Sequence, residues 1–167
     1  VLVFPDDEGG FDVLPMFWIP GDDLADRAEA DRVPYIVWRD QGHVVAPPGA
    51  TTDPRFIAAE IARLHARYGI RRLAYDRWRI EDLKRALAEE GVTEHDLELV
   101  AHGQGFRDMA PAIDRLEAAV AERKLRHGGH PVLQWNISNC VAVADPAGGR
   151  KLDKSKSYGR IDGAVAL

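Results

Sequence analysis

Two aspartates stand where a carboxylate could hold a metal ion. Asp76 ends an expected strand over residues 72–76, just before an expected helix, and in open α/β sheets ligands gather outside the carboxyl ends of strands. Asp162 stands at the start of an expected terminal helix over residues 161–167. Each has an ordinary alternative role, because aspartate caps helices and is favoured near their N-termini. Nothing local in the sequence shows that the two carboxylates meet in space.

Paired carboxylates would matter for the hydrolysis of a phosphodiester. At neutral pH this reaction needs a strong nucleophile and a stabilised leaving oxygen, and two magnesium ions roughly 3.5–4 Å apart can supply both. Magnesium prefers carboxylate and water oxygens to thiolate or imidazole. Such a site needs several acidic side chains and no Cys or His.

The segment directly before Asp162 is basic, although the chain as a whole has a formal net charge of -5. Residues 149–160 carry five basic side chains and one acidic side chain. A flexible basic loop beside a metal site could hold a phosphate backbone through Lys154 and Lys156; the alternative is a solvated loop. The negative net charge of the chain argues against a dedicated high-affinity DNA-binding module. It does not argue against a metal-dependent nuclease, whose site needs carboxylates.

Other polar residues give weaker signals. His127 and His130 lie on a Gly-rich loop at a spacing that fits no metal site, and we expect them to be structural. Asn136 and Asn139 are one helical turn apart, so they could share a face or form a buried hydrogen-bond pair. Cys140 is the single cysteine, so it cannot form an internal disulfide. It fits the core of a protein in a reducing compartment such as the cytosol.

The sequence lacks the motifs that are typical of several classes of protein. There is no Gly-x-x-x-x-Gly-Lys-Ser/Thr loop and no Gly-x-Gly-x-x-Gly turn, which excludes the known routes to ATP and dinucleotides. There is no Gly-x-Ser-x-Gly elbow, which disfavours an α/β-hydrolase. No apolar run approaches the roughly 18 residues of a membrane span.

An α/β domain would position the candidate residues. We expect strands over residues 1–4, 11–19, 72–76 and 97–101, and helices over residues 54–68, 79–90 and 108–123. The first two strands flank a Gly-rich turn and would form an antiparallel hairpin. Later strands alternate with helices, which indicates a parallel section, so the sheet would be mixed and flanked by helices.

The segment between these parts gives a less regular pattern. Residues 21–52 read as an excursion from the sheet, with a helix-compatible stretch over 22–32 and short strands over 35–38 and 43–46. The helix that follows has the clearest boundaries, because Asp53 is a strong N-cap and Gly69 a strong C-terminal cap.

Six short motifs follow one another in a fixed order. They are Tyr75–Trp78, Gly103–Phe106, Lys124–Trp135, Ser138–Asn139, Asp153–Lys156 and Arg160–Leu167. Each motif alone is weak, but the ordered set is specific. Together they resemble the C-terminal half of tailed-phage terminase large subunits, and the similarity runs from the first strand to the last residue.

The resemblance implies a ribonuclease H-like fold and a metal-dependent endonuclease that cuts concatemeric phage DNA by two-metal hydrolysis. Matched by motif, Asp76 and Asp162 would be catalytic residues and ligands of Mg²⁺, with Mn²⁺ as a substitute. The implied partners are double-stranded DNA, a small terminase subunit and the capsid portal, and the implied location is the host cytoplasm, away from membranes.

One departure from the family pattern concerns the first metal ligand. The family's first metal-binding aspartate lies on a strand just upstream of residues 1–4, so this strand is missing here. Asp6 and Asp7 lie in the hairpin turn and do not replace it, and Asp12 is only a weak candidate.

We therefore expect residues 1–167 to be a single nuclease domain, truncated at both ends and lacking the upstream ATPase domain. By itself it would bind magnesium poorly, cut little and expose an unpaired sheet edge. Two alternatives stay open. One is a non-catalytic docking module of the packaging motor, and the other is an α/β enzyme acting on a small phosphorylated substrate.

Overall fold

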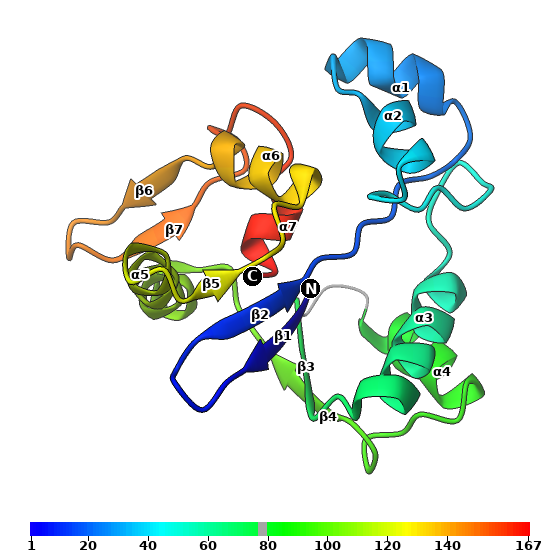
Figure 1. Cartoon of the computed structure of the whole chain (residues 1–167), viewed down its shortest axis with the longest axis horizontal. Coiled ribbons are helices and arrows are strands. Elements are labelled where there is room, and N and C mark those ends of the chain that lie inside the picture. Colours follow the sequence, from blue (N-terminus) through cyan, green and yellow to red (C-terminus); the bar gives the residue numbers. More distant parts are fainter. Residues whose placement is uncertain (77–79) are drawn as a thin grey trace.

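The computed structural model describes residues 1–76 and 80–167 as a mixed α/β arrangement (Figure 1). The strands are β1 (Leu2–Pro5), β2 (Phe11–Leu14), β3 (Arg72–Tyr75), β4 (Glu98–Ala101), β5 (Leu125–Arg126), β6 (Ala142–Ala144) and β7 (Arg150–Leu152). The helices are α1 (Leu24–Asp31), α2 (Tyr35–Asp40), α3 (Pro54–Tyr68), α4 (Ile80–Glu89), α5 (Phe106–Ala121), α6 (Pro131–Asn139) and α7 (Asp162–Val165). None of these described helices combines the length and apolar character of a membrane crossing.

The N-terminal hairpin has the predicted form. β1 and β2 pair antiparallel, with Leu2 opposite Leu14. The Asp6 carboxylate accepts from the backbone N–H groups of Glu8 and Gly10, which closes the turn. β2 ends at Leu14 and not at residue 19 as expected, because Pro15 cannot donate to a ladder.

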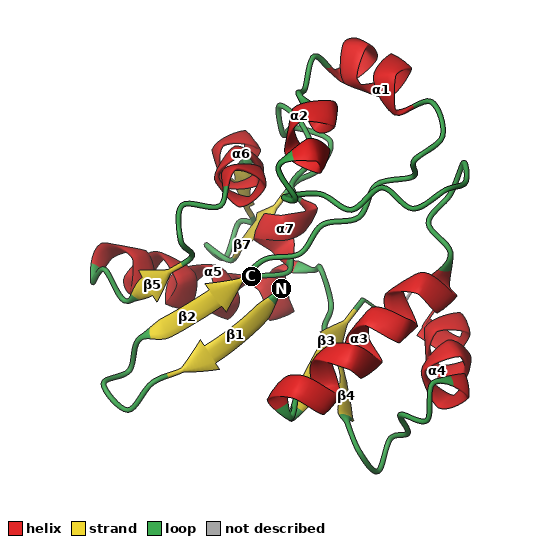
Figure 2. Ribbon diagram, turned by 45° about the vertical axis from the view of Figure 1, so that its right-hand side comes forward, coloured by secondary structure: helices red, strands yellow, loops and turns green. Residues whose placement is uncertain are grey.

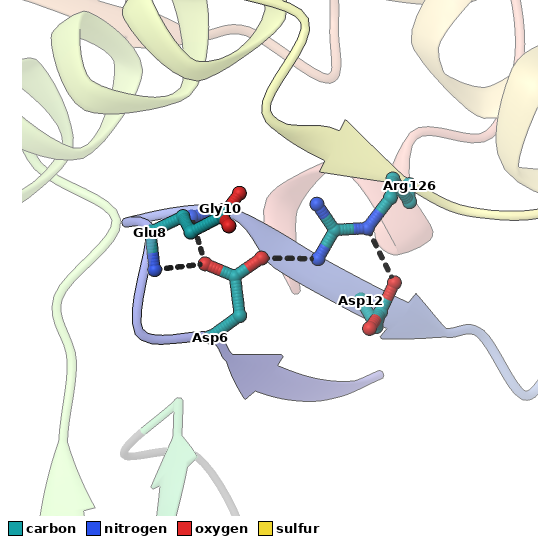
Figure 3. Close-up of polar contacts among 5 residues, drawn as sticks. All are labelled: Asp6, Glu8, Gly10, Asp12 and Arg126. Carbon is teal, nitrogen blue, oxygen red and sulfur yellow. Dashed lines mark hydrogen bonds and ion pairs between the residues drawn. The ribbon is translucent and has the colours of Figure 1, made fainter.

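Arg126 joins the hairpin to β5, a two-residue strand that pairs parallel with β2 (Figure 3). Its guanidinium donates from Nε to Asp12 at 2.7 Å and from Nη2 to Asp6 at 2.6 Å. The backbone N–H of Gly10 and then the guanidinium of Arg126 lower the pKa of Asp6. Side-chain bonds therefore support a backbone pairing that is very short.

The second part of the fold places β3 and β4 in parallel, with α3 and α4 packed on one another beside them (Figure 1). The predicted caps of α3 are confirmed: the Asp53 side chain accepts from Arg55 N, and Gly69 takes the left-handed conformation with φ 60. Small and branched apolar side chains from both helices and the loop before β4 form its core, including Ala58, Leu87 and Leu97.

The described strands form three separate sheets, β1–β2–β5, β3–β4 and β6–β7, where we expected one mixed sheet. The first of these is mixed, since β2 pairs antiparallel with β1 and parallel with β5. Within the described residues, β1 and β3 each pair on one side only. A continuous sheet needs a hydrogen-bonding neighbour on both sides of every inner strand, and that condition is not met between β1 and β3.

The excursion over residues 21–52 contains two helices. The first, α1, matches the helix-compatible stretch, but the strand expected over 35–38 is wrong, because those residues begin α2. Tyr35 and Trp38 lie three residues apart on one helical face and are both buried, and the ring of Trp38 packs at a tilt against that of Trp135 of α6, with their centroids 5.5 Å apart. The strand expected over 43–46 is reduced to a single bridge between Trp18 and Val45.

The C-terminal part is more ordered than the sequence indicated. The basic segment was expected to be a loop, but its first residues form β7, which pairs with β6. Arg150 of β7 is bound by two carboxylates of α5, from Asp114 and Glu117. The loop proper is limited to residues 153–160.

Candidate active site

Helix α6 holds the segment that carries Asp162. Asn136 is 2% exposed; its Nδ2 donates to Val132 O at 2.9 Å, and its Oδ1 accepts from Gly163 N at 2.8 Å. Gly163 is the second residue of α7, and the first N–H groups of a helix have no partner within it. Asn136 therefore caps α7 from a neighbouring helix.

Asn139 fixes the stretch just before α7. Its Nδ2 donates to Arg160 O at 3.2 Å, and its backbone carbonyl accepts from Tyr158 N at 3.1 Å. Of the two roles left open for the asparagines, the shared face is confirmed: both are buried on α6, and each bonds the backbone of the C-terminal segment instead of the other asparagine. Their spacing in the sequence does not indicate this positioning role.

The start of α6 is fixed by a histidine cluster. His130 Nδ1 accepts from Leu133 N at 3.5 Å as an N-cap, and Pro131 occupies the first turn. The ring of His43 lies 5.0 Å from that of His130. Burial first, and then the charges of His43 and His127, lower the pKa of His130 below its ordinary value of 6.5. His130 therefore has a structural role, as expected.

Asp162 begins α7 and is exposed, and its carboxylate accepts from Lys154 Nζ at 2.6 Å. A cation therefore already reaches this carboxylate. Lys154 was predicted to contact phosphate, but in this structure its ammonium group is engaged by Asp162.

A tight turn presents the two lysines. The Asp153 carboxylate accepts from the backbone N–H and the hydroxyl of Ser155, and these bonds lower its pKa. The Asp153 carbonyl accepts from the Ser157 hydroxyl at 2.8 Å. Lys154 and Lys156 are consequently both exposed on this turn.

Asp76 follows β3 directly and is exposed. Its Oδ2 accepts from Gln104 Nε2 at 2.6 Å. Gln104 lies in the loop that follows β4, the strand paired with β3, so the parallel pairing brings the two side chains together. The motif that contains Gln104 was noted in the sequence, but its role was not. Arg77 and Trp78 of the Tyr75–Trp78 motif lie outside the described residues.

The two aspartates have separate partners. In Figure 1, α7 and the carboxyl end of β3 both lie toward the middle of the molecule, near the two termini. Over residues 1–76 and 80–167, no interaction joins Asp76 to Asp162, and no group of three or more His, Cys, Asp or Glu side chains could hold a metal ion. The carboxylate chemistry suits magnesium, but the described ligands are too few to complete a site.

A pocket of about 560 Å³ opens beside Asp162. One wall comes from the end of α1 and the start of α2, and the other from residues 158–162 together with Trp135 of α6. Figure 2 shows α7 near the C-terminus, below α2 and α6. Three cationic side chains line the pocket, from Arg32, Lys154 and Arg160.

Residues 2–167 match the family described as terminase large subunit, endonuclease domain. The chain belongs to this family. As a terminase endonuclease domain it is 45% identical over 161 residues to the large terminase subunit of Enterobacteria phage HK97, covering 96% of this chain and 31% of that protein. It is 30% identical over 165 residues to protein YmfN of Escherichia coli (strain K12), covering 94% of this chain and 35% of that protein.

A solved structure gives the same assignment for the terminase domain. The crystal structure of the HK97 bacteriophage large terminase superposes with a TM-score of 0.91 at 44% identity, over 98% of this chain and 34% of that chain. The predicted family is thereby confirmed. The chain spans about a third of the length of these relatives.

Proposed function

We propose that this terminase domain has a ribonuclease H-like fold and works as a magnesium-dependent DNA endonuclease that cuts concatemeric viral DNA. The supporting observation is the pair of exposed carboxylates, Asp76 after β3 and Asp162 at the start of α7, in a chain that matches a nuclease family over residues 2–167. Placing an acidic residue after a strand of an α/β fold suits ligand binding at that edge.

Asp76 and Asp162 would hold magnesium, with further ligands from the rest of the full-length protein. Bound magnesium would activate water and neutralise charge on the phosphate. The protein's own contribution is position: Gln104 holds the Asp76 carboxylate, and Asn136 holds the backbone next to Asp162. Oriented ligands of this kind depend on the groups that support them.

The two lysines would contact the DNA backbone. A metal ion bound at Asp162 would repel the Lys154 ammonium group, which bonds Oδ1 of this carboxylate in the structure. Lys154 would then be free to contact a phosphate, and Lys156 is exposed on the same turn. Phosphate contacts of this kind position the strand without reading its sequence. We propose double-stranded DNA as substrate, a small terminase subunit and the portal as partners, and the host cytoplasm as the location.

The direct test replaces each carboxylate by an amide in the full-length protein. Asp76→Asn and Asp162→Asn keep the side-chain shape but remove the charge, so we expect a loss of at least about a hundredfold in magnesium-dependent cleavage, the scale of losing metal affinity. Cleavage of linear duplex DNA is measured by gel, and folding by circular dichroism. Asp7→Asn, in the exposed hairpin turn, is the matched control. Retained cleavage in either variant would refute the assignment.

A docking module that does not cut is the second candidate. It is favoured by the lack of a third acidic ligand in the described part of the chain. A calorimetric titration of the full-length protein with magnesium separates the two candidates. Saturable binding that Asp162→Asn removes supports the nuclease, whereas no binding together with no cleavage supports docking alone.

A further inference from the structure

We propose that the pocket beside Asp162 binds one unpaired nucleotide of a DNA strand, with its base stacked on Tyr158 and its phosphate held by Arg32 and Arg160. This inference rests on the proposed function for the nature of the ligand. The inference goes beyond the proposed function because it assigns α1 and α2 to the DNA-binding surface. These two helices carry neither of the candidate catalytic aspartates.

Tyr158 is the first observation that points to a base. Its side chain is 87% exposed, far more than the other exposed large apolar residues of the described chain, which reach 55% at Val120. Its backbone is nevertheless fixed, because its N–H donates to the Asn139 carbonyl. An aromatic ring held in solvent at a pocket rim offers a stacking surface for a base.

Arg160 is the second observation, because its guanidinium is already oriented. Its Nε donates to Tyr35 Oη at 3.3 Å, and its Nη2 lies 3.6 Å from Asp31. Tyr35 Oη in turn donates to Asp31 at 2.8 Å. This network joins α1, α2 and the C-terminal segment, and it leaves other N–H groups of Arg160 to face a ligand, since an arginine has five.

Arg32 is the third observation, because it carries a positive charge that the acidic side chains lining the pocket do not neutralise. Lys154 pairs with Asp162, and Arg160 lies beside Asp31. Within the described residues, no ion pair involves Arg32, which is exposed directly after α1 with φ 54. Among the described residues the pocket therefore retains one unpaired cation, and phosphate is the anionic group that a DNA strand presents.

The shape of the pocket favours a single unpaired nucleotide over a duplex. Its volume of about 560 Å³ lies in the range of small-ligand sites, roughly 300–1,000 Å³. The face of a base within a duplex is covered by its neighbours, so the base cannot stack on a tyrosine ring until it leaves the duplex. Because Asp162 also lines the pocket, such a nucleotide would sit next to the carboxylate assigned to cutting.

The test measures binding by the full-length protein in EDTA, so that no cleavage occurs. The probe is a short single-stranded oligonucleotide with one central 2-aminopurine, compared with its duplex. Tyr158→Ala should weaken single-strand binding about tenfold, as expected for losing one stacked base, and should reduce the quenching of 2-aminopurine. Tyr158→Phe should retain both. Duplex binding should change less than about twofold for either variant.

Arg32→Gln should weaken single-strand binding and lower the salt dependence of log Kd by about one phosphate contact. Arg123→Gln is the matched control, because Arg123 is also an exposed arginine after a helix with φ 56. The proposal is overturned if Tyr158→Ala binds the single strand as wild type does, or if it loses single strand and duplex equally.

The two proposals fail separately. If the wild-type protein cuts duplex DNA with magnesium but the Tyr158 and Arg32 variants bind single strands normally, only the pocket assignment falls. If the wild-type protein does not cut but Tyr158→Ala still loses single-strand binding, the endonuclease proposal falls and the pocket assignment stands.

Discussion

The bond between Asn136 and Gly163 allows a quantitative test of how α7 is held. Asn136→Leu keeps the number and branching of the side-chain heavy atoms but leaves the Gly163 N–H without an acceptor, at a place where both residues are buried. An unsatisfied buried donor costs about 1–3 kcal/mol. For a chain of 167 residues, each kcal/mol lowers Tm by about 2–4 °C, so the variant should melt roughly 2–12 °C below wild type.

Thermal unfolding followed by circular dichroism measures this shift. Ser138→Ala on the same helix is the control, because Ser138 is exposed and its hydroxyl donates to Trp135 O of its own turn; its effect should stay within about 0.5 kcal/mol. Cleavage should also fall in Asn136→Leu, since α7 carries Asp162. A melting temperature equal to that of Ser138→Ala would refute the idea that Asn136 caps α7.

Two further outcomes concern stability. Arg126→Gln loses the contacts with Asp6 and Asp12, so it should lower Tm. The difference in Tm from wild type should narrow between about 0.1 M and 1 M salt, because salt screens exposed ion pairs. A difference in Tm that salt does not change would contradict this prediction. His130 has a depressed pKa, so its contribution to stability is present above about pH 6.5 and is lost as the pH falls through the pKa of the folded state. His130→Asn keeps a capping side chain without titrating, and it should melt with a shallower loss in acid; a slope equal to wild type would count against this role.

The elements that were predicted correctly have strong local signals. Asp53 and Gly69 bound α3 where expected, because a capping side chain and a left-handed glycine act within one turn of the chain. The Gly-rich turn likewise fixed the first hairpin. These features do not depend on residues far away in the sequence.

The helix α2 shows why other predictions failed. Its residues Tyr35 to Trp38 are aromatic or β-branched, which favours a strand locally. In the fold, Tyr35 and Trp38 instead share a helical face against Trp135, almost a hundred positions along the chain. Packing at that distance overrides local preference, and no short pattern in the sequence encodes it.

The residues of the candidate site stay predictions, and the side chains that support them were not predicted from the sequence. Motif order singled out Asp76 and Asp162, and these stay predictions as metal ligands. The side chains that hold them come from elsewhere: Gln104 from the loop after the neighbouring strand, and Asn136 from another helix. Such bonds depend on strand pairing and helix packing, which sequence spacing does not reveal.

The dependence of α7 on α6 also has a consequence for local opening of the protein. α7 has four residues, too few to persist alone in water, and its attachment runs through Asn136 and Asn139. If α6 unravels, α7 and the loop before it would lose their anchors in the same event. Amide protons of both helices should therefore exchange with one shared opening free energy, as a single cooperative unit.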